Sequence, residues 1–463
     1  MEVDVVIIGS GVGGYTAALR GAQLGLKIAL VEKNQLGGTC VNHGCIPTKA
    51  LVNSAQMWEG IKNSKKFGFN FDNYSLNYSK IVENKDTVVN RLLMGVSVLL
   101  RARKVNIIKG IAEIINPKEV IVYNNQGDKE TIKTKNIIIA TGSKIKKIPI
   151  EGLDNKNVFY SEEILKQKEL PKNMLIIGGG YSGIEFASIF NSFDVKVEVV
   201  DILDRILLQV DKEVATSLLG FLKKRGINFS LSSSVKNIIQ KGEKVAVYVG
   251  NNNGEKEIIV DRVLVSTGRV PDFGGLNVEK LGIELEGEGI KVDKYLKTSI
   301  PGIYAIGDVT AKVMLAHVAS MQGQVAINNI IGEKNPMSYK NIPFCVFSSP
   351  EVASVGLTEK EASEEFTNIK IFKFPYLANG KAISMNQYDG YIKMIAQKNN
   401  NQIIGVHIIG AHASDLIAET TLAIQKGCTA KDIADTIHAH PTLPEIIAEA
   451  AEGILGHPIH VVK

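Results

Sequence analysis

The stretch Asp4-Val5-Val6-Ile7-Ile8-Gly9-Ser10-Gly11-Val12-Gly13-Gly14 decides how the chain begins to fold. Its apolar run opens into G-x-G-x-x-G at Gly9, Gly11 and Gly14, and a helical segment and a second strand, Lys27 to Val31, follow. The first glycine allows a tight turn, the second lets the backbone approach a pyrophosphate, and the third packs helix on strand. The phosphates would lie at the helix N-terminus. This pattern predicts a dinucleotide-binding unit.

The chain contains this unit twice. Met174-Leu175-Ile176-Ile177 leads into a second glycine-rich turn at Gly178, Gly180 and Gly183, and again a helical segment and a strand follow. Both units close on a strand and a Thr-Gly turn, at Thr141-Gly142 in the first and at Thr267-Gly268 in the second. Two such units predict two bound dinucleotides.

An acid ends the second strand of each unit. The same number of positions separates Gly9 from Glu32 and Gly178 from Asp201. Each carboxylate is placed to accept hydrogen bonds from a ribose diol. Asp201 would repel a 2′-phosphate, so the second site favours NAD over NADP. Arg205, four residues later, is either a surface residue near this site or a group that meets a phosphate.

Composition and charge exclude several other classes of protein. A chain of 463 residues should hold about three domains. The net charge of +5 comes from 53 basic and 48 acidic residues that are scattered along the chain, so no basic stripe marks a nucleic-acid or membrane face. Strand-like sequence begins almost at once, and no apolar run approaches about 18 residues. We expect a cytoplasmic protein.

Two of the four cysteines lie in Gly37-Gly38-Thr39-Cys40-Val41-Asn42-His43-Gly44-Cys45-Ile46-Pro47-Thr48-Lys49. Pro47 suits the first turn of a helix, which puts Cys45 near a helix N-terminus, where the dipole stabilises a thiolate. So few cysteines do not form a secreted disulfide framework, and a close pair in a reducing compartment is more often catalytic or metal-binding than a permanent cross-link.

Three interpretations of the cysteine pair compete. A zinc site would need two further ligands, and neither Cys345, Cys428 nor a spaced histidine pair supplies a second knuckle. Two inert thiols would be ordinary residues of a core. A redox disulfide beside a bound cofactor accounts for the neighbouring features best, and it is the interpretation that we favour.

The sequence changes character from about residue 341. Apparent strands over 344–347, 390–396 and 403–409 predict an antiparallel sheet, and helical patterns over 413–425 and 443–455 follow it. The last helical pattern is preceded by His438-Ala439-His440-Pro441-Thr442-Leu443-Pro444-Glu445. One of these histidines could pair with Glu445, which would fix its tautomer and raise its basicity. Spacing alone does not choose between His438 and His440.

The ordered set of motifs resembles the pyridine nucleotide–disulfide oxidoreductases over essentially the whole length of the chain. It comprises the cysteine stretch, both dinucleotide units with their Thr-Gly turns, Tyr304-Ala305-Ile306-Gly307-Asp308, and the His438 to Glu445 segment. The resemblance implies an α/β protein with two Rossmann-like dinucleotide-binding domains and a C-terminal α+β dimerisation domain. The FAD-binding domain would comprise residues 1–149 and 271–340, the NAD-binding domain 150–270, and the dimerisation domain 341–463. Active sites would be built across a homodimer.

The same resemblance assigns roles to the thiols and their base. Cys45 resembles the flavin-side thiol, and Cys40 resembles the interchange thiol that meets the substrate. His440 resembles the catalytic base, held by Glu445 and reaching the disulfide of the other subunit. His438 is then structural.

The resemblance also assigns residues to the cofactors. Lys49 resembles the lysine near the reactive edge of the flavin, paired with Glu185. Asp308 resembles the acid on the ribityl chain. The residues expected to hold FAD are Gly9, Gly11, Gly14, Glu32, Lys49, Thr141, Gly142 and Asp308. Those expected to hold NAD are Gly178, Gly180, Gly183, Asp201 and Gly268.

The activity implied by this resemblance is the oxidation of protein-bound dihydrolipoamide by NAD⁺ through a Cys40–Cys45 disulfide. The partner would be a lipoyl-bearing acyltransferase or H-protein of a 2-oxo acid dehydrogenase or glycine cleavage system. Two alternatives stay open: an NAD(P)H-dependent reductase of another disulfide, and a non-enzymatic dinucleotide sensor with a redox switch. The pairing of His440 with Glu445 disfavours the sensor, because signalling needs no proton shuttle.

Overall fold

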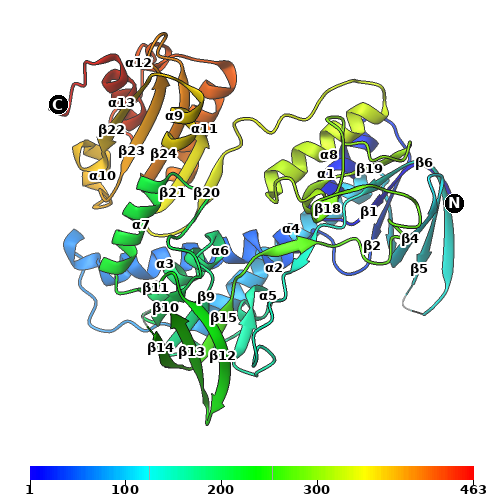
Figure 1. Cartoon of the computed structure of the whole chain (residues 1–463), viewed down its shortest axis with the longest axis horizontal. Helices are drawn as coiled ribbons and strands as arrows, with labels where there is room; N and C mark the ends of the chain where they lie inside the picture. The colour runs from blue at the N-terminus through cyan, green and yellow to red at the C-terminus, as the bar shows by residue number, and fades with distance from the viewer. Residues whose placement is uncertain (125, 253, 463) are drawn as a thin grey trace.

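The computed structural model describes residues 1–124, 126–252 and 254–462. Figure 1 shows that the N-terminal sheet with its helices and the C-terminal sheet with its helices lie at opposite upper corners, and that the second dinucleotide unit lies below and between them. Among the described residues, no helix is both long and apolar enough to cross a membrane.

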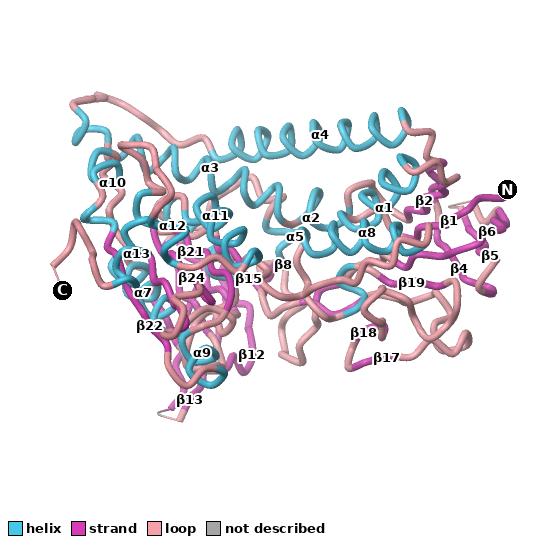
Figure 2. The backbone as a smooth tube through the Cα atoms, turned by 90° about the horizontal axis from the view of Figure 1, so that it is seen from above, coloured by secondary structure: helices cyan, strands magenta, loops and turns pink. Residues whose placement is uncertain are grey.

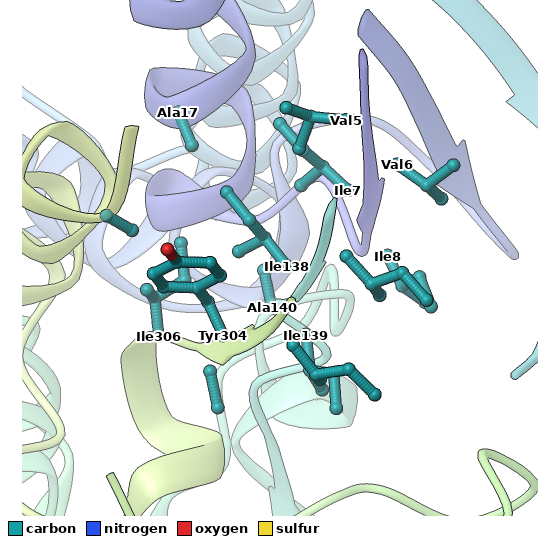
Figure 3. Packing of buried hydrophobic residues seen from close by; sticks show 14 of the residues in the cluster. Val5, Val6, Ile7, Ile8, Ala17, Ile138, Ile139, Ala140, Tyr304 and Ile306 are labelled. Atoms are coloured by element: carbon teal, nitrogen blue, oxygen red, sulfur yellow. The ribbon is translucent and has the colours of Figure 1, made fainter. Parts of the chain in front are cut away.

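The first sheet is built around β1 (Glu2–Ile8), which pairs in parallel with β2 (Ile28–Glu32) on one side and with β6 (Lys129–Ile139) on the other. Outside them lie β3 (Asn106–Lys109), β4 (Ile111–Asn116) and β5 (Glu119–Tyr123). Residues 5–8 are almost fully buried. Figure 3 shows Val5 and Ile7 on the side of Ile138, while Val6 points to the other side of the strand. The apolar run predicted as a strand is therefore the centre of the first core.

Two helices pack against each other beside this sheet: α1 (Val12–Gln23) and α8 (Ala316–Ile330). Between β6 and α8 the chain leaves, builds a second sheet, and returns. It re-enters at β19 (Ile303–Ala305), which pairs in parallel with β6, and η2 (Gly307–Thr310) follows. Segments far apart in the sequence therefore share one sheet.

The second sheet is parallel in the order β11-β10-β9-β15-β8. Its strands are β8 (Val158–Tyr160), β9 (Asn173–Ile177), β10 (Lys196–Val200), β11 (Asn228–Ser230) and β15 (Arg262–Val265). Its helices are α5 (Ser161–Ile164), α6 (Tyr181–Ser192) and α7 (Lys212–Lys224). An antiparallel sheet of β12 (Ser234–Lys241), β13 (Lys244–Asn251) and β14 (Gly254–Val260) extends from it. The predicted repeat of strand, turn, helix and strand is confirmed.

The connections between the two sheets form a ribbon of their own. β7 (Ser143–Ile145) pairs antiparallel with β16 (Arg269–Pro271). The polar residues that begin this connection form a strand because the returning chain supplies a strand to pair with. A small hairpin of β17 (Leu285–Glu286) and β18 (Gly289–Ile290) follows.

The C-terminal sheet is antiparallel in the order β20-β21-β24-β23-β22. Its strands are β20 (Phe344–Val346), β21 (Glu351–Gly356), β22 (Ile369–Pro375), β23 (Tyr391–Gln397) and β24 (Ile403–Gly410). Its helices are α9 (Glu359–Glu365), α10 (Gly380–Ser384), α11 (Ala413–Lys426), α12 (Ala430–Ala434) and α13 (Glu445–Leu455). The three predicted strands and two predicted helices are confirmed, whereas β21 and β22 were not predicted.

The cysteine stretch folds into two closely spaced helices. α2 (Gly38–His43) carries Cys40, and α3 (Cys45–Lys62) begins at Cys45. The predicted position of Cys45 near a helix N-terminus is confirmed. Figure 2 shows α3 leading away from the first sheet, with the long α4 (Tyr78–Ala102) beside it. The six-residue α2 was not predicted. α3 also packs against α6 and so connects the cysteines to the second unit.

Candidate active site

The two glycine-rich turns have the same stereochemistry. Gly9 and Gly178 have φ of +100° and +112°, where L side chains are strained. A Cβ at Gly9 would lie 2.4 Å from the Ala140 carbonyl oxygen, and one at Gly178 would lie 2.3 Å from the Ser266 carbonyl oxygen. These close approaches let each turn pass directly over the neighbouring strand.

The other glycines of the turns separate into two kinds. A Cβ at Gly14 would lie 1.9 Å from the carbonyl oxygen of Gly9, and the equivalent distance for Gly183 is 2.0 Å, so both pack helix on strand. In contrast, apart from the glycine itself and its two chain neighbours, no described residue has an atom within 4 Å of a Cβ built at Gly11 or Gly180. The second glycine of each turn therefore faces open space, as a turn that admits a pyrophosphate requires.

Each Thr-Gly turn carries an unsatisfied hydroxyl. The buried Oγ1 atoms of Thr141 and Thr267 find no hydrogen-bond partner among the described residues. The glycines that follow them, Gly142 and Gly268, both have positive φ, of +74° and +100°. Buried polar groups are nearly always paired, so the orphaned hydroxyls point to a polar ligand at each turn.

The two acids hold their own turns. Glu32 accepts hydrogen bonds from the Ser10 amide (2.9 Å) and hydroxyl (2.6 Å), and Asp201 accepts from the amides of Gly179 (2.5 Å) and Leu203 (2.8 Å). Glu32 also accepts from the Asn34 amide (2.8 Å). A carboxylate has about four acceptor positions, so Glu32 retains about one and Asp201 about two for the hydroxyls of a ribose.

Arg205 donates to two carbonyl groups of its own loop, those of Leu208 (2.8 Å) and Val210 (3.3 Å). These bonds tie the guanidinium to the protein backbone. They favour the interpretation of Arg205 as a residue near the second site over that of a phosphate ligand.

A cavity of about 1140 Å³ runs from the first turn to the cysteines. It exceeds the roughly 300–1,000 Å³ of most small-molecule sites, which suits an extended dinucleotide. The predicted FAD residues that line it are Gly9, Gly11, Glu32, Lys49, Thr141, Gly142 and Asp308, and Cys40, Cys45 and Glu185 line it too. The open Gly11 and the orphaned Thr141 both line this cavity, so the residues fit FAD.

Of the predicted NAD residues, Gly178, Gly180 and Gly183 belong to the turn between β9 and α6 and the start of α6, Asp201 follows β10 and accepts from the amide of Gly179 in that turn, and Gly268 follows β15. They are not among the residues that line the large cavity. The helix that follows this turn nevertheless reaches it, through Tyr181, Ser182 and Glu185. The two predicted sites therefore adjoin along α6.

Sequence patterns did not identify Ser143 and Arg269 as site residues. Ser143 Oγ donates to Asp308 (2.6 Å), and Arg269 Nε donates to Ser143 Oγ (2.8 Å) while a terminal nitrogen donates to its carbonyl oxygen (2.7 Å). Each residue directly follows the Thr-Gly turn of its unit, which is the signal that could have identified both. The β7–β16 ribbon brings the two together at Asp308.

The two cysteines differ sharply in acidity. Both are free thiols in this structure. A hydrogen bond from the Cys40 thiol, opposed by burial and assisted by the Lys49 ammonium, lowers the pKa of Cys45 to about 7. The same hydrogen bond, together with burial, raises the pKa of Cys40. The reduced pair therefore carries its negative charge on Cys45.

Lys49 and Glu185 are paired as predicted. Lys49 Nζ donates to both carboxylate oxygens, at 2.9 and 2.8 Å, and Glu185 is buried. The Phe347 amide also donates to Glu185 (3.0 Å), and the Phe347 ring centroid lies 4.3 Å from Lys49 Nζ. Phe347 was not identified from the sequence.

The structure separates the two histidines that spacing could not. His440 Nδ1 lies 2.8 Å from Glu445, which also accepts from the Thr442 amide (2.7 Å). Burial alone would raise the pKa of Glu445, but these two hydrogen bonds outweigh it and hold the pKa below its ordinary value. The His440 side chain is 77% exposed, whereas that of His438 is 9% exposed and uses both ring nitrogens, on Glu419 and Thr436.

His440 and Glu445 are not among the residues that line the large cavity of this chain. Their exposure leaves the imidazole Nε2 open to a molecule outside the subunit. Among the described residues, no group of three or more histidine, cysteine, aspartate or glutamate side chains could hold a metal ion.

Fold and site together define a dinucleotide-dependent disulfide oxidoreductase. Residues 3–323 match the family model described as pyridine nucleotide-disulphide oxidoreductase, and residues 342–451 match the dimerisation domain of the same family. The chain therefore belongs to the pyridine nucleotide-disulphide oxidoreductases, whose cofactors are FAD and NAD. The matched dimerisation domain supports the predicted homodimer.

Similar proteins include the dihydrolipoyl dehydrogenase of Bacillus subtilis strain 168, which is 42% identical over all of this chain and 98% of the relative. The dihydrolipoyl dehydrogenase of Geobacillus stearothermophilus is also 42% identical, with the same coverage. Among solved structures, the HOCl-induced flavoprotein disulfide reductase RclA of Escherichia coli, as its Cu(II) complex, matches with a TM-score of 0.89 and 29% identity, covering 98% of this chain and 99% of that one.

Proposed function

We propose that this chain oxidises protein-bound dihydrolipoamide to lipoamide and reduces NAD⁺ to NADH. The observation that carries the proposal is a cysteine pair of unequal acidity, Cys40 and Cys45, inside a cavity that also contains a dinucleotide turn. The substrate is proposed from the relatives of 42% identity that are named dihydrolipoyl dehydrogenase.

In the proposed thiol chemistry, the disulfide of the cysteine pair accepts the two electrons of the substrate dithiol. One substrate thiolate attacks Cys40 Sγ of the disulfide, which forms a mixed disulfide and releases Cys45 as a thiolate. The second substrate thiolate attacks the substrate sulfur of that mixed disulfide, so lipoamide leaves and Cys40 is released. Two electrons now reside on the dithiol, and two protons have left the substrate. Bound FAD supplies the two-electron transfer from this dithiol to NAD⁺.

A base must receive the substrate protons. In the proposal this base is His440, contributed to the cysteine pair of the other subunit. Glu445 holds Nδ1, which leaves Nε2 to accept a proton from an incoming thiol. The charge-assisted bond to Glu445 also stabilises the imidazolium that forms. The exposure of His440 supports an action outside its own subunit.

The remaining chain residues position the cofactors in this proposal. FAD would be held by Gly9, Gly11, Gly14, Glu32, Lys49, Thr141, Gly142 and Asp308, with Ser143 and Arg269 fixing Asp308. NAD would be held by Gly178, Gly180, Gly183, Asp201 and Gly268. We retain the domain boundaries of 1–149 with 271–340, 150–270 and 341–463 as part of the proposal.

The dihydrolipoamide would arrive on a lipoyl-bearing acyltransferase or H-protein of a 2-oxo acid dehydrogenase or glycine cleavage system. A cytoplasmic location follows from the same proposal, since the redox pair must cycle through its reduced form in a reducing compartment.

Steady-state assays separate this function from its alternatives. We expect rapid oxidation of dihydrolipoamide with NAD⁺, slower oxidation with NADP⁺, and little reduction of glutathione disulfide by NADH. A preference for glutathione disulfide would favour a reductase, and no turnover with any thiol or disulfide would favour a sensor.

The variant C40S tests the role of the interchange thiol. Serine cannot form the mixed disulfide, so lipoamide turnover should be lost, while transfer from NADH to an artificial dye persists because it does not need Cys40. C428S, which replaces a cysteine beyond the residues that line the cavity, is the matched control. Unchanged lipoamide turnover in C40S would contradict the proposed mechanism.

A further inference from the structure

Phe347 directly follows β20 and lies where three parts of the chain meet. Its amide donates to Glu185 of α6, and its ring covers the ammonium of Lys49 on α3. The contact between Phe347 and Glu185 joins residues that are 162 positions apart. The C-terminal sheet therefore touches the ion pair beside the cysteines directly.

The ammonium of Lys49 has two anchors. On one side the Glu185 carboxylate accepts from it with both oxygens. On the other side the face of the Phe347 ring attracts the cation, an interaction that strengthens when water is excluded. The Lys49 side chain is 32% exposed and that of Glu185 is 5% exposed, so the carboxylate is shielded from water while the lysine side chain is partly open to it. The ring opposes movement of the ammonium toward that water.

We propose that Phe347 is a positioning residue whose ring fixes the Lys49 ammonium between Glu185 and the cysteine pair. The position of this charge matters for the thiol chemistry. The acidity of Cys45 depends first on the hydrogen bond from Cys40, but the Lys49 ammonium also lowers the pKa of Cys45 and the Glu185 carboxylate raises it. An ammonium that drifts toward solvent leaves the effect of the carboxylate uncompensated.

The segment that carries Phe347 is anchored independently of its ring. The Ser349 amide donates to Ser188 of α6 (3.0 Å), and Arg225 donates to the Ser349 hydroxyl (3.2 Å). The bond from the Phe347 amide to Glu185 is a backbone contact and survives any side-chain replacement other than proline. Substitution of Phe347 therefore removes the ring while the segment stays docked.

The inference rests on the proposed function in one respect, the assignment of Cys45 as the flavin-side thiol. The test uses the FAD-bound protein in a C40S background, in which Cys45 is the remaining thiol of the pair. A thiolate against the flavin gives a long-wavelength absorbance, and its pH midpoint reports the acidity of Cys45 without any turnover. F347L and F347M remove the ring, F347Y retains it, and F221L is the matched control.

Phe221 suits the control because Lys224 lies over its ring at 5.8 Å on α7, distant from the cysteines in the sequence and absent from the cavity lining. F347L and F347M should raise the midpoint by about half a pH unit or more, whereas F347Y and F221L should leave it unchanged. Thermal melting of each variant identifies any that fails to fold, and F347M preserves most of the side-chain volume.

The possible results distinguish a failure of the role proposed for Phe347 from a failure of the assignment of Cys45. A C40S parent without the long-wavelength band would overturn the assignment of Cys45 and the inference with it. A parent with the band, together with F347L and F347M midpoints equal to that of the parent, would overturn the inference alone. A shift of the same size in F221L would also overturn it, because the effect would then be general to loss of an aromatic ring.

Discussion

The two dinucleotide turns share their backbone, and the helices that follow them differ in chemistry. Each turn has a first glycine with positive φ, an open second glycine and a third glycine that packs on the first. Helix α1 then buries small residues against α8, whereas α6 buries two phenylalanines and the charged Glu185. The two turns therefore offer the same backbone geometry to a phosphate, and the two sites differ in the side chains of the helix that follows each turn.

The equivalent helix positions show this difference most directly. The residue two positions after the third glycine is Thr16 in α1 and Glu185 in α6. The Thr16 hydroxyl accepts a hydrogen bond from the Ser320 hydroxyl of α8, at 3.4 Å. Glu185 instead binds Lys49 and lines the cavity of the first unit. The second unit therefore contributes a charged group to the redox site of the first.

The largest effect should come from replacing the open second glycine of each turn, one turn at a time, with a larger residue. In G11V the new side chain fills the open space where the pyrophosphate of FAD would pass, so the protein should purify without flavin and without activity. G180V should remain yellow, while reduction of its flavin by NADH falls about a hundredfold or more. The ratio of flavin to protein absorbance and stopped-flow rates measure both.

G220V serves as the control, because a Cβ at Gly220 would meet no described atom within 4 Å beyond its chain neighbours and the backbone of α7 itself, and this glycine lies outside both turns. The variant should retain its flavin and its rate of reduction. Loss of flavin from G180V would show that the two turns are not independent, which would break the comparison.

Much of this architecture follows from local patterns, and the remainder depends on contacts between distant segments. The apolar run 5–8 and the glycines after it predict β1 and its turn because strand burial and turn geometry are local. Pro47 likewise predicts that Cys45 lies near the N-terminus of a helix. In contrast, β7 forms only because the returning chain pairs with it, and Phe347 gains its contact with Glu185 across 162 positions. Local sequence contains no signal for either contact.

The site shows the same division. The Lys49–Glu185 pairing was expected from the resemblance to a family, since nothing in the spacing joins two residues 136 positions apart. The choice of His440 over His438 was likewise expected from the resemblance and not from spacing, since the partner that occupies His438, Glu419, lies on a separate helix. Residue types and local order predict what a site contains, and long-range packing decides which neighbours it has.

A smaller effect should follow from neutralising Glu185 of α6, whose equivalent in α1 is the uncharged Thr16. E185Q keeps the shape of the side chain but weakens a charge-assisted pair worth about 1.5–3 kcal/mol, so flavin reduction by NADH should fall about ten- to a hundredfold. T16V alters the equivalent position of α1 and should change the rate by less than about twofold. Stopped-flow reduction measures both rates, and equal losses in the two variants would contradict the assigned difference between the helices.

Cofactor preference should change less again. D201N removes the charge that repels a 2′-phosphate while keeping an oxygen that can accept from the Gly179 amide. For a partly exposed charge the effect is about 1 kcal/mol, so the ratio of kcat/KM for NAD⁺ to that for NADP⁺ should fall about fivefold. E32Q, at the same position of the first unit, should leave this ratio unchanged. A fall of this ratio in both variants would mean that Glu32 also affects binding of the nicotinamide cofactor, so that the two acids do not serve separate sites.

The smallest effect is a shift in the acidity of Cys45, which connects the two units. Its pKa of about 7 lies below that of an ordinary thiol, so in the reduced protein the thiolate is present above pH 7 and is protonated as the pH falls through 7. The long-wavelength absorbance of the reduced, FAD-bound protein should therefore fade with a midpoint near pH 7. Because the Glu185 carboxylate raises this pKa, E185Q should move the midpoint down by about half a pH unit, whereas T16V should leave it in place. An upward movement in E185Q would show that the carboxylate acts mainly by holding Lys49 near the thiolate, and the charge of the second unit would then stabilise the thiolate of the first.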